Sequence, residues 1–333
     1  SLKMVNLLLE AGANPDAVDV AHSTPLHWSV HHKDSSEMLL IVDSLLKHGA
    51  DSWATSIEGI PACVLHVDRA DDGQVQAIYR VFVQHTSYSK SSFRSKILHY
   101  WLHHTDFSFL RGKFTFSSQK LQFLMDLSEQ DIRGTDEMNS LHVITSFIYK
   151  LTSDPDPAVS RLTSILNSVM ESKTNNLHES LVNAKGDFGM TPFHYALLSH
   201  ENLVRFSEKD EEFRELKELH NLFLVKIFEA GVDPSKSDAH GNFPIHFAAR
   251  AGLHDILKLM LKNPKADVNQ TDKHGSTALH FSVFAHSSET IQLLIDSGCN
   301  VDSKDTRGRT PFDVAFLLGY EEICRLLKRG EDF

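Results

Sequence analysis

Apolar and polar positions follow helical spacing in short blocks along this chain, and the block from 238 to 272 is the most regular. Its first part has Ile245, Ala248 and Ala249 on one side, which predicts a short helix whose small residues let a second helix approach closely. Its second part, His254 to Lys262, has apolar residues three and four positions apart, which predicts an amphipathic helix. The block therefore predicts two helices that pack against each other.

Turn-forming residues bound both predicted helices. Gly241 can take the positive φ of a tight turn, which other residues resist. Pro244 stands at the first position of the first helix, where a missing N–H costs nothing, and Gly252 ends that helix. Asn263 and Pro264 stop the second helix. The block is therefore a turn, a helix, a second turn and a second helix.

Four residues at the start of the first helix recur along the chain. The copies are Thr24-Pro25-Leu26-His27, Thr191-Pro192-Phe193-His194, Phe243-Pro244-Ile245-His246, Thr277-Ala278-Leu279-His280 and, with a changed last residue, Thr310-Pro311-Phe312-Asp313. The last three copies are 34 and 33 residues apart, counted from Pro244 to Ala278 and from Ala278 to Pro311. A fixed period of about 33 residues predicts one helical hairpin that is repeated and stacked.

These residues resemble the ankyrin repeat, a β-turn followed by two antiparallel helices with the hallmark T-P-L-H-x-A. Period, capping residues and apolar pattern agree with one another in several copies. The resemblance implies an all-α fold, an α-solenoid of stacked helix-turn-helix units with β-turn fingers. It also implies that the histidine of the hallmark makes local hydrogen bonds that join neighbouring units, which is a structural role.

The resemblance further implies that residues 1–333 form one array of about eight units after an N-terminal half-unit. We expect a partial repeat at 1–19, one repeat at 19–56, two degenerate repeats at 57–135, two repeats with insertions at 136–237 and three repeats at 238–333. Since the chain opens on a second helix without its first, we expect a fragment of a longer protein.

The middle of the chain departs from the regular pattern in two ways. Pro61 lies 36 residues after Pro25, so we expect a degenerate repeat in which Pro61 stands at the position of Pro25. Between Glu201 and His220, a charged run either extends the helix of the unit at Thr191 or adds another helix. Insertions in a solenoid map to surface loops on one face.

Composition restricts the class of protein. Hydrophobic residues make up 41% of the chain and charged residues 23%, which is normal for a folded domain. The net charge of −11 argues against nucleic-acid binding, and no apolar run reaches the roughly 18 residues of a membrane span. The three cysteines, Cys63, Cys299 and Cys324, are odd in number and widely separated, which favours the reducing cytoplasm or nucleus.

No catalytic or nucleotide-binding motif occurs in the sequence, so we expect neither an enzyme nor a small-molecule substrate. The pairs His27/His31 and His99/His103 have the spacing of two ligands on one helical face. Neither has a cysteine or carboxylate at ligand spacing to complete a metal site. We therefore expect no metal and no cofactor.

The resemblance implies binding on the concave face, which the turn tips and the exposed ends of the first helices form. Carried over position by position, the candidate partner-binding residues are Phe188, Met190, His240, Asn242, Lys273, His274, Phe284, Arg307 and Arg309. Ser23 and His31 hold such positions in the N-terminal repeat. For Phe188 the alternative is packing against the insertion, and for Phe284 it is packing in the core.

The function that these features favour is a non-catalytic scaffold that binds a partner protein or peptide. Lys273, Arg307 and Arg309 make the C-terminal tips locally basic, which suits an acidic partner, while solvated tips without a partner are the alternative. Two other functions stay open. One is the ankyrin segment of a transcriptional regulator, similar to inhibitors of Rel-type factors or to fungal cell-cycle factors. The other is the regulatory arm of an enzyme or channel outside this chain.

Overall fold

The structure is a computed structural model that describes residues 1–57, 59–71, 73–86, 182–207 and 211–328, with individual residues between 93 and 167. The chain divides into two compact units, Ser1–Arg133 and Gly134–Phe333, and each is taken by itself below. The elements named among the described residues are helices, with two isolated β-bridges. The predicted all-α class is therefore confirmed, whereas one continuous array over the whole chain stays a prediction.

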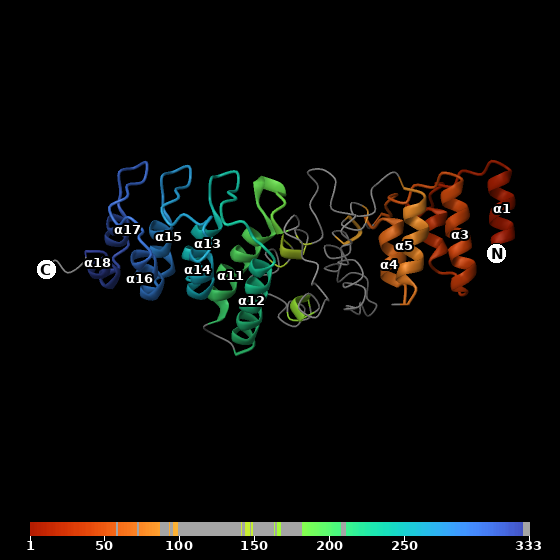
Figure 1. Cartoon of the computed structure of the whole chain (residues 1–333). Coiled ribbons are helices and arrows are strands. Elements are labelled where there is room, and N and C mark those ends of the chain that lie inside the picture. The colour runs from red at the N-terminus through yellow and green to blue at the C-terminus, as the bar shows by residue number, and fades with distance from the viewer. Residues whose placement is uncertain are drawn as a thin grey trace. The chain divides into compact units, whose positions relative to one another are not determined.

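The described part of the N-terminal unit contains two helix pairs and one further helix. Its elements are α1 (Leu2–Glu10), α2 (Pro25–Ser29), α3 (Ser35–Lys47), α4 (Ala62–Arg69) and α5 (Val75–Gln84). The pair α2–α3 packs against the pair α4–α5, with α2 against α4 and α3 against α5, and α1 packs on α3. Figure 1 shows α1, α3 and α5 side by side in this order. First helices thus lie beside first helices and second helices beside second helices, as stacked repeats require.

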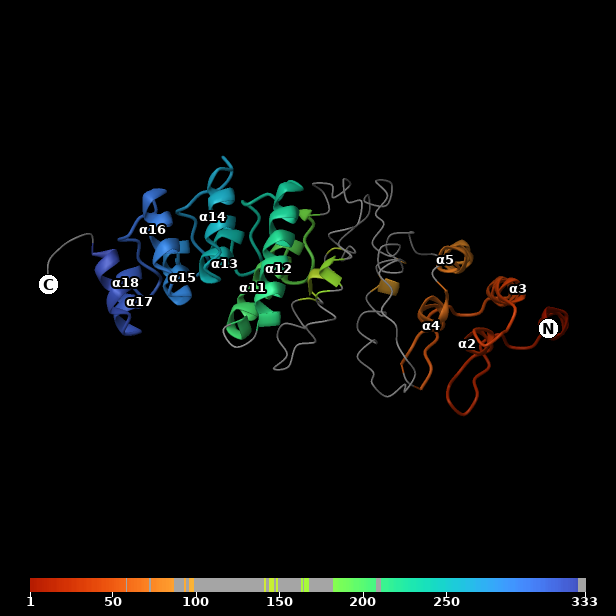
Figure 2. The ribbon, with the colours of Figure 1, turned by 90° about the horizontal axis from the view of Figure 1, so that it is seen from below.

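The described part of the C-terminal unit repeats the same arrangement four times. Its elements are η2 (Asp187–Gly189), α11 (Pro192–Ser207), α12 (Glu211–Glu229), α13 (Pro244–Arg250), α14 (His254–Leu261), α15 (Ala278–Ala285), α16 (Ser288–Asp296), α17 (Pro311–Leu317) and α18 (Glu321–Leu327). Helix α15 packs between α13 and α17, and α16 packs between α14 and α18. Figure 2 shows α13 and α15 in one row and α14 and α16 in another.

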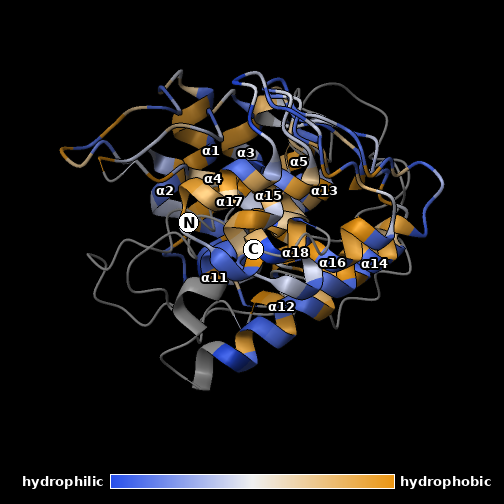
Figure 3. Cartoon of the chain, turned by 90° about the vertical axis from the view of Figure 1, so that its left-hand side faces the viewer, coloured by the Kyte–Doolittle hydropathy of each residue, from blue (hydrophilic) through white to orange (hydrophobic). Residues whose placement is uncertain are grey.

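The charged run of the insertion is divided between two helices. Helices α11 and α12 have 16 and 19 residues, whereas α13 and α14 have 7 and 8. They pack along each other, and Leu216, His220 and Phe223 of α12 are buried. Hydrophobic and hydrophilic sides of α12 are both visible in Figure 3. Of the two alternatives for this segment, the structure therefore shows extension: both helices of the unit are lengthened.

The hallmark histidine makes the hydrogen bonds that the resemblance implies. Nδ1 of His280 accepts from the backbone N–H of Thr277 at 3.1 Å, and Nε2 donates to the carbonyl oxygen of Arg309 in the next unit at 3.0 Å. His246 repeats both contacts, with the carbonyl oxygen of Gln270 as the acceptor at 3.0 Å. One side chain thus closes its own helix and connects two units.

The register predicted for Pro61 is wrong by one residue. Pro61 precedes the first residue of α4 and has the extended backbone of an N-cap, with φ −67° and ψ 145°. It also pairs with Thr55 in a β-bridge, as Thr277 pairs with Thr271. Pro61 therefore occupies the threonine position of the hallmark, and Ala62 occupies the proline position. The error arose because Pro61 was matched to Pro25, whereas the second helix of this unit, α3, has 13 residues against 9 in α16 and so shifts the cap of the next first helix.

Two glycines provide a matched test of how tightly the loops stack. Gly241 and Gly308 have φ of 79° and 75°, so alanine costs each roughly 1–2 kcal/mol of backbone strain. A Cβ on Gly241 would lie 3.0 Å from the backbone nitrogen of Lys273, whereas one on Gly308 would meet no atom within 4 Å. We expect Gly241→Ala to lower the free energy of unfolding by a further 1 kcal/mol or so, since the crowded backbone must move. Urea titration measures this difference, and equal losses would contradict the close stacking.

Candidate functional site

The candidate site begins with loops that we call fingers, residues 186–190, 238–242, 272–276 and 305–309, each of which precedes a first helix. Each finger closes with a backbone hydrogen bond between its first and last residues, such as Asp238 N–H to Asn242 O at 2.9 Å. In three fingers the first residue is an aspartate. Oδ1 of Asp238 accepts the N–H groups of His240 and Asn242, both at 2.8 Å. An aspartate thus holds the finger backbone.

Neighbouring fingers are joined by single backbone hydrogen bonds. Ala239 N–H donates to Phe188 O at 2.7 Å, Lys273 N–H to His240 O at 3.1 Å, and Thr306 N–H to His274 O at 2.8 Å. The third residue of each finger therefore occupies the same place in successive units. We call these residues the tip row: Phe188, His240, His274 and Arg307. Figure 1 shows the fingers before α13, α15 and α17 projecting to one side of their helices.

Most predicted binding residues are accessible, and one is not. Phe188 is 73% exposed and Phe284 56%, and the side chains of four others are also exposed: His240, Lys273, His274 and Arg307. Asn242 and Arg309 are half-buried. Met190 is only 9% exposed, because it closes its finger beside the start of α11. Its assignment as a contact residue is corrected: Met190 supports the finger from inside.

The backbone of Phe188 carries strain. Its φ of 56° lies in the left-handed region, which costs a residue with a Cβ roughly 1–2 kcal/mol. Gly186 holds the aspartate position in this finger and has no side chain to accept hydrogen bonds, so the turn relies on Gly186 N–H to Met190 O at 2.8 Å. A strained, exposed aromatic residue at a loop tip is typical of a recognition residue. The alternative in which Phe188 packs away from solvent is not observed.

Two of the predicted basic residues are engaged within the fingers. Nε and Nη2 of Arg309 donate to Oδ2 of Asp305 at 2.8 and 2.7 Å. Burial tends to raise the pKa of Asp305, but hydrogen bonds from Arg309 and Arg307 outweigh burial and lower that pKa overall. Nζ of Lys273 donates to the carbonyl oxygen of Ala239 at 2.6 Å. Both side chains therefore stabilise the fingers, and Arg307 is the tip-row cation that points to solvent.

The ends of the first helices add a second line of side chains. Arg250, Phe284 and Leu317 hold the same position in successive units, and all three are exposed. Nε of Arg250 lies 3.2 Å from Oε1 of Glu201 on α11, so its charge is paired. Leu317 is 68% exposed. The exposed ends of these helices therefore present an aromatic and an aliphatic side chain, Phe284 and Leu317, beside a paired arginine.

A groove in the N-terminal unit is a feature that the sequence did not reveal. It lies between the loops before α2 and α4 on one side and the ends of these helices on the other. Sequence reasoning placed Ser23 and His31 at variable positions, but it did not single out Ile57, Leu65 or Arg69, which line the same groove. The repeat at Pro61 was expected, but its hallmark residues are degenerate, so its variable positions were not assigned. The exposure of Ile57, 69%, follows only from the folded loop.

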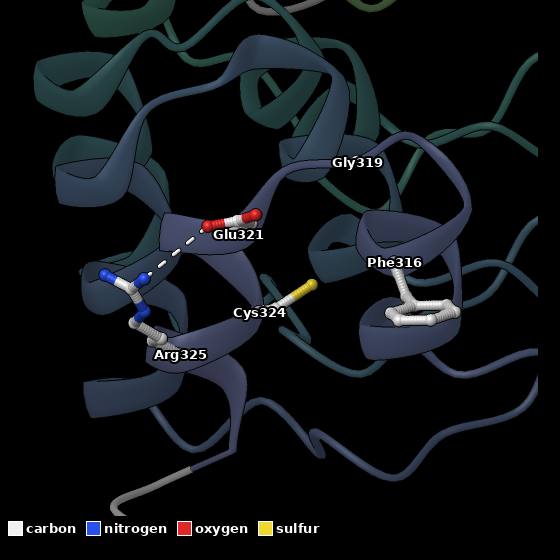
Figure 4. Close-up of a pocket in the computed structure, with 5 residues that line it drawn as sticks. All are labelled: Phe316, Gly319, Glu321, Cys324 and Arg325. Carbon is white, nitrogen blue, oxygen red and sulfur yellow. Dashed lines mark ion pairs between the residues drawn. The ribbon is translucent and has the colours of Figure 1, made fainter. Parts of the chain in front are cut away.

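A second depression, beside α17 and α18, has a different origin (Figure 4). It has a volume of about 440 Å³ and is lined by Phe316, Gly319, Cys324 and an ion pair, Glu321 with Arg325 at 3.5 Å. Phe316 is 70% exposed, whereas Val283, the residue at its position in the preceding unit, is fully buried against α17. This surface therefore corresponds to the one that each unit uses for stacking, and we do not assign it a ligand.

Metal and cofactor chemistry finds no support in the described residues. No group of three or more histidine, cysteine or acidic side chains could hold a metal ion there. His27 is committed to its helix cap and to the carbonyl oxygen of Ile60, 3.1 Å away, so it cannot act as a ligand with His31. His99 and His103 lie outside the described residues. No described helix has the length and apolar character needed to cross a membrane.

Comparisons with known proteins support the repeat assignment at both ends. The sequence model for three copies of the ankyrin repeat matches residues 216–305 and 245–333, and the model for one ankyrin repeat matches residues 22–56. No curated protein matches the chain. The matched segments contain the hallmark at Thr24 and the three regular copies from Phe243 onward, and they include three of the four residues of the tip row.

The exposure of the two aromatic residues gives a direct test. We expect Phe188→Ala and Phe284→Ala each to change the free energy of unfolding by less than about 0.5 kcal/mol, because neither ring is in the core. Phe193, which is fully buried at the start of α11, is the matched control, and its replacement by alanine should cost about 3–5 kcal/mol. Urea unfolding followed by circular dichroism measures all three. A large loss at Phe188 would show that it packs internally.

Buried histidines predict how stability depends on pH. Burial lowers the pKa of His66 to about 4, although its hydrogen bond to Leu26 O acts in the opposite direction, and burial lowers that of His220 to about 3. In the unfolded chain a histidine has a pKa of about 6.5. Below pH 6.5 the unfolded chain therefore takes up protons that the folded chain excludes, so stability falls as pH falls. The expected loss is about 3 kcal/mol per histidine by pH 4.

Urea titrations between about pH 7.5 and 5.5 test this expectation, since few carboxylates titrate in that range. The slope of stability against pH should decrease in His66→Leu, which removes one titrating group. His274→Ala, at an exposed fingertip, is the control and should leave the slope unchanged. Stability independent of pH across this range would show that folding does not lower the pKa of these histidines.

Proposed function

Because this chain belongs to the ankyrin repeat family, we propose that it is a non-catalytic scaffold that binds a partner protein through the tip row and the adjoining first-helix ends. Ankyrin repeats are general protein–protein interaction modules, which supports this class of function. Such domains are typically non-catalytic. The three cysteines are free and buried, which supports a reducing compartment, the cytoplasm or the nucleus.

The observation that carries the proposal is the fixed spacing of the tip row. Because backbone hydrogen bonds join the fingers, the side chains of Phe188, His240, His274 and Arg307 are presented in a set order without prior rearrangement. Preorganised side chains lose little conformational entropy when a partner binds. An extended surface of a partner can therefore contact several units together, which multiplies weak single contacts.

The energetic anchors are fewer than the sequence predicted. Phe188 and Phe284 offer exposed aromatic rings, and Arg307 offers a charge that no described residue pairs. Aromatic residues and arginine dominate measured binding energies at interfaces. Arg309 would have to give up two hydrogen bonds to Asp305 before it could bind a partner, so we do not include it among the anchors.

The surface suits an acidic partner, although fewer basic side chains are available than the sequence predicted. Arg307, the amine of Lys273 and the imidazoles of His240 and His274 remain at the tips, while Asp305 is neutralised by Arg309. Attraction of this kind raises the association rate and selects the orientation of a partner more than it adds affinity. We therefore propose that the partner carries carboxylates opposite the tip row.

Photocrosslinking from the proposed anchors tests the function. With p-benzoylphenylalanine in place of Phe188 or Phe284, irradiation in a lysate of the source cells should yield covalent adducts with a distinct protein. Arg307→Glu in the same chain should remove most of that adduct, because it reverses the charge that faces an acidic partner.

Leu222 supplies the matched control, since it is 58% exposed but lies on the second helix α12. The same photoreactive residue at 222 should yield no adduct above background. Equal adducts at 222, or none at 188 and 284, would exclude binding at the tip row. Adducts that persist in Arg307→Glu would support binding at this surface and contradict an acidic partner.

A further inference from the structure

The groove of the N-terminal unit has a composition that points to a particular kind of ligand. It is formed by two finger-like loops and by the ends of α2 and α4. Its lining residues are Ala21, Ser23, His27, His31, Ser56, Ile57, Ile60, Leu65 and Arg69. The two loops are joined by one backbone hydrogen bond, Ile57 N–H to Ala21 O at 2.9 Å, so the outer wall has a fixed position relative to the helices.

Apolar side chains form one part of the groove. Ile57 is 69% exposed on the outer wall, Leu65 on α4 is half-buried on the inner wall, and Ile60 is 8% exposed at the base. An exposed isoleucine side chain is unfavourable in water. Its burial against a ligand contributes about 1.5–3 kcal/mol of favourable free energy. The groove therefore favours an apolar group between Ile57 and Leu65.

The charge in the groove has one sign. Arg69, the last residue of α4, is exposed, and the described lining residues contain no carboxylate. A carboxylate of the loop before α2, Asp19, accepts the N–H groups of Ala21 and Ser23 and the indole N–H of Trp28, all within 2.9 Å. These hydrogen bonds lower the pKa of Asp19 against the effect of burial, and its charge is directed into its own loop. Arg69 is thus available for an anion.

The volume of the groove favours a peptide over a small molecule as its ligand. Its volume is about 170 Å³, below the roughly 300–1,000 Å³ of sites that enclose small ligands or cofactors. A space of this size accommodates one or two side chains. A partner that places one side chain in such a space is an extended chain that continues beyond the groove.

We propose that the N-terminal groove binds an extended segment of a partner protein in which an apolar side chain stands next to a carboxylate. The apolar side chain packs between Ile57 and Leu65, and the carboxylate accepts hydrogen bonds from the guanidinium of Arg69, with His31 at the same end of the groove. The inference rests on the proposed function, since it assumes that the repeats bind a protein. It adds a second contact surface and the chemistry of its ligand.

The test uses the whole chain and defined peptides. Phage-displayed random nonapeptides are selected on the 333-residue protein, and the best binder is made with a fluorophore for polarisation measurements. We expect selected sequences to share an apolar residue followed or preceded by Asp or Glu. Replacing that acid by its amide, or making Arg69→Ala in the protein, should weaken binding about tenfold. Ile57→Ala should weaken it by a similar factor through lost apolar contact.

Two exposed residues of the same unit provide matched controls. Arg80 on α5 and Leu40 on α3 lie outside the groove, so Arg80→Ala and Leu40→Ala should bind the peptide as the unmodified chain does. Thermal melting of each variant shows that it is folded. Loss of binding that is equal in Arg80→Ala and Arg69→Ala would reduce the effect to net charge and overturn the proposal.

Other outcomes separate this inference from the proposed function. If the peptides bind to the Arg69→Ala variant but not to Phe188→Ala or Arg307→Ala, binding at the groove is contradicted and binding at the tip row is supported. Peptides without an acidic residue would overturn the assigned chemistry. If sedimentation showed that the chain self-associates and that Arg69→Ala abolishes this, the groove would hold a second copy rather than a partner. No selected peptide at all would count against both proposals.

Discussion

The stacking of these repeats depends on a neutral imidazole that carries its proton on Nε2. Only that form accepts at Nδ1 from its own helix cap and donates at Nε2 to the next unit, as His246 and His280 both do. Burial lowers the pKa of both side chains and so maintains the neutral form. At His27, His246 and His280 the same side chain caps its own helix and connects its unit to the next one.

The last copy of the hallmark, in which aspartate replaces the histidine, shows which half of this interaction can be separated. Oδ2 of Asp313 accepts from Thr310 N–H and Oγ–H, both at 2.8 Å, so the helix cap is kept. These hydrogen bonds lower the pKa of Asp313, so its carboxylate stays ionised and has no proton to donate. The forward link to a neighbouring carbonyl oxygen therefore cannot form. The histidine at the end of the hallmark therefore has two roles: it caps its own helix and it connects two units.

The sequence was sufficient for features that depend on local spacing and insufficient for those that depend on side-chain direction. The period of 33–34 residues and the caps predicted the helix pairs and the finger positions. They did not predict that Met190 turns inward or that the charge of Arg309 is used by Asp305, since both follow from contacts made after folding. Pro61 was misplaced for a related reason: the second helix α3 has 13 residues against 9 in α16, which shifts the residue that caps the next helix.

The division of labour within a finger explains why binding residues are difficult to identify from the hallmark. Aspartate at the first position and glycine at the fourth satisfy the turn in the fingers at 238–242, 272–276 and 305–309. The third residue contributes only its carbonyl oxygen to the ladder, and every residue has one. Its side chain is therefore unconstrained, and successive units place histidine, histidine and arginine there. Selection for a partner can act at that position without a change in the backbone.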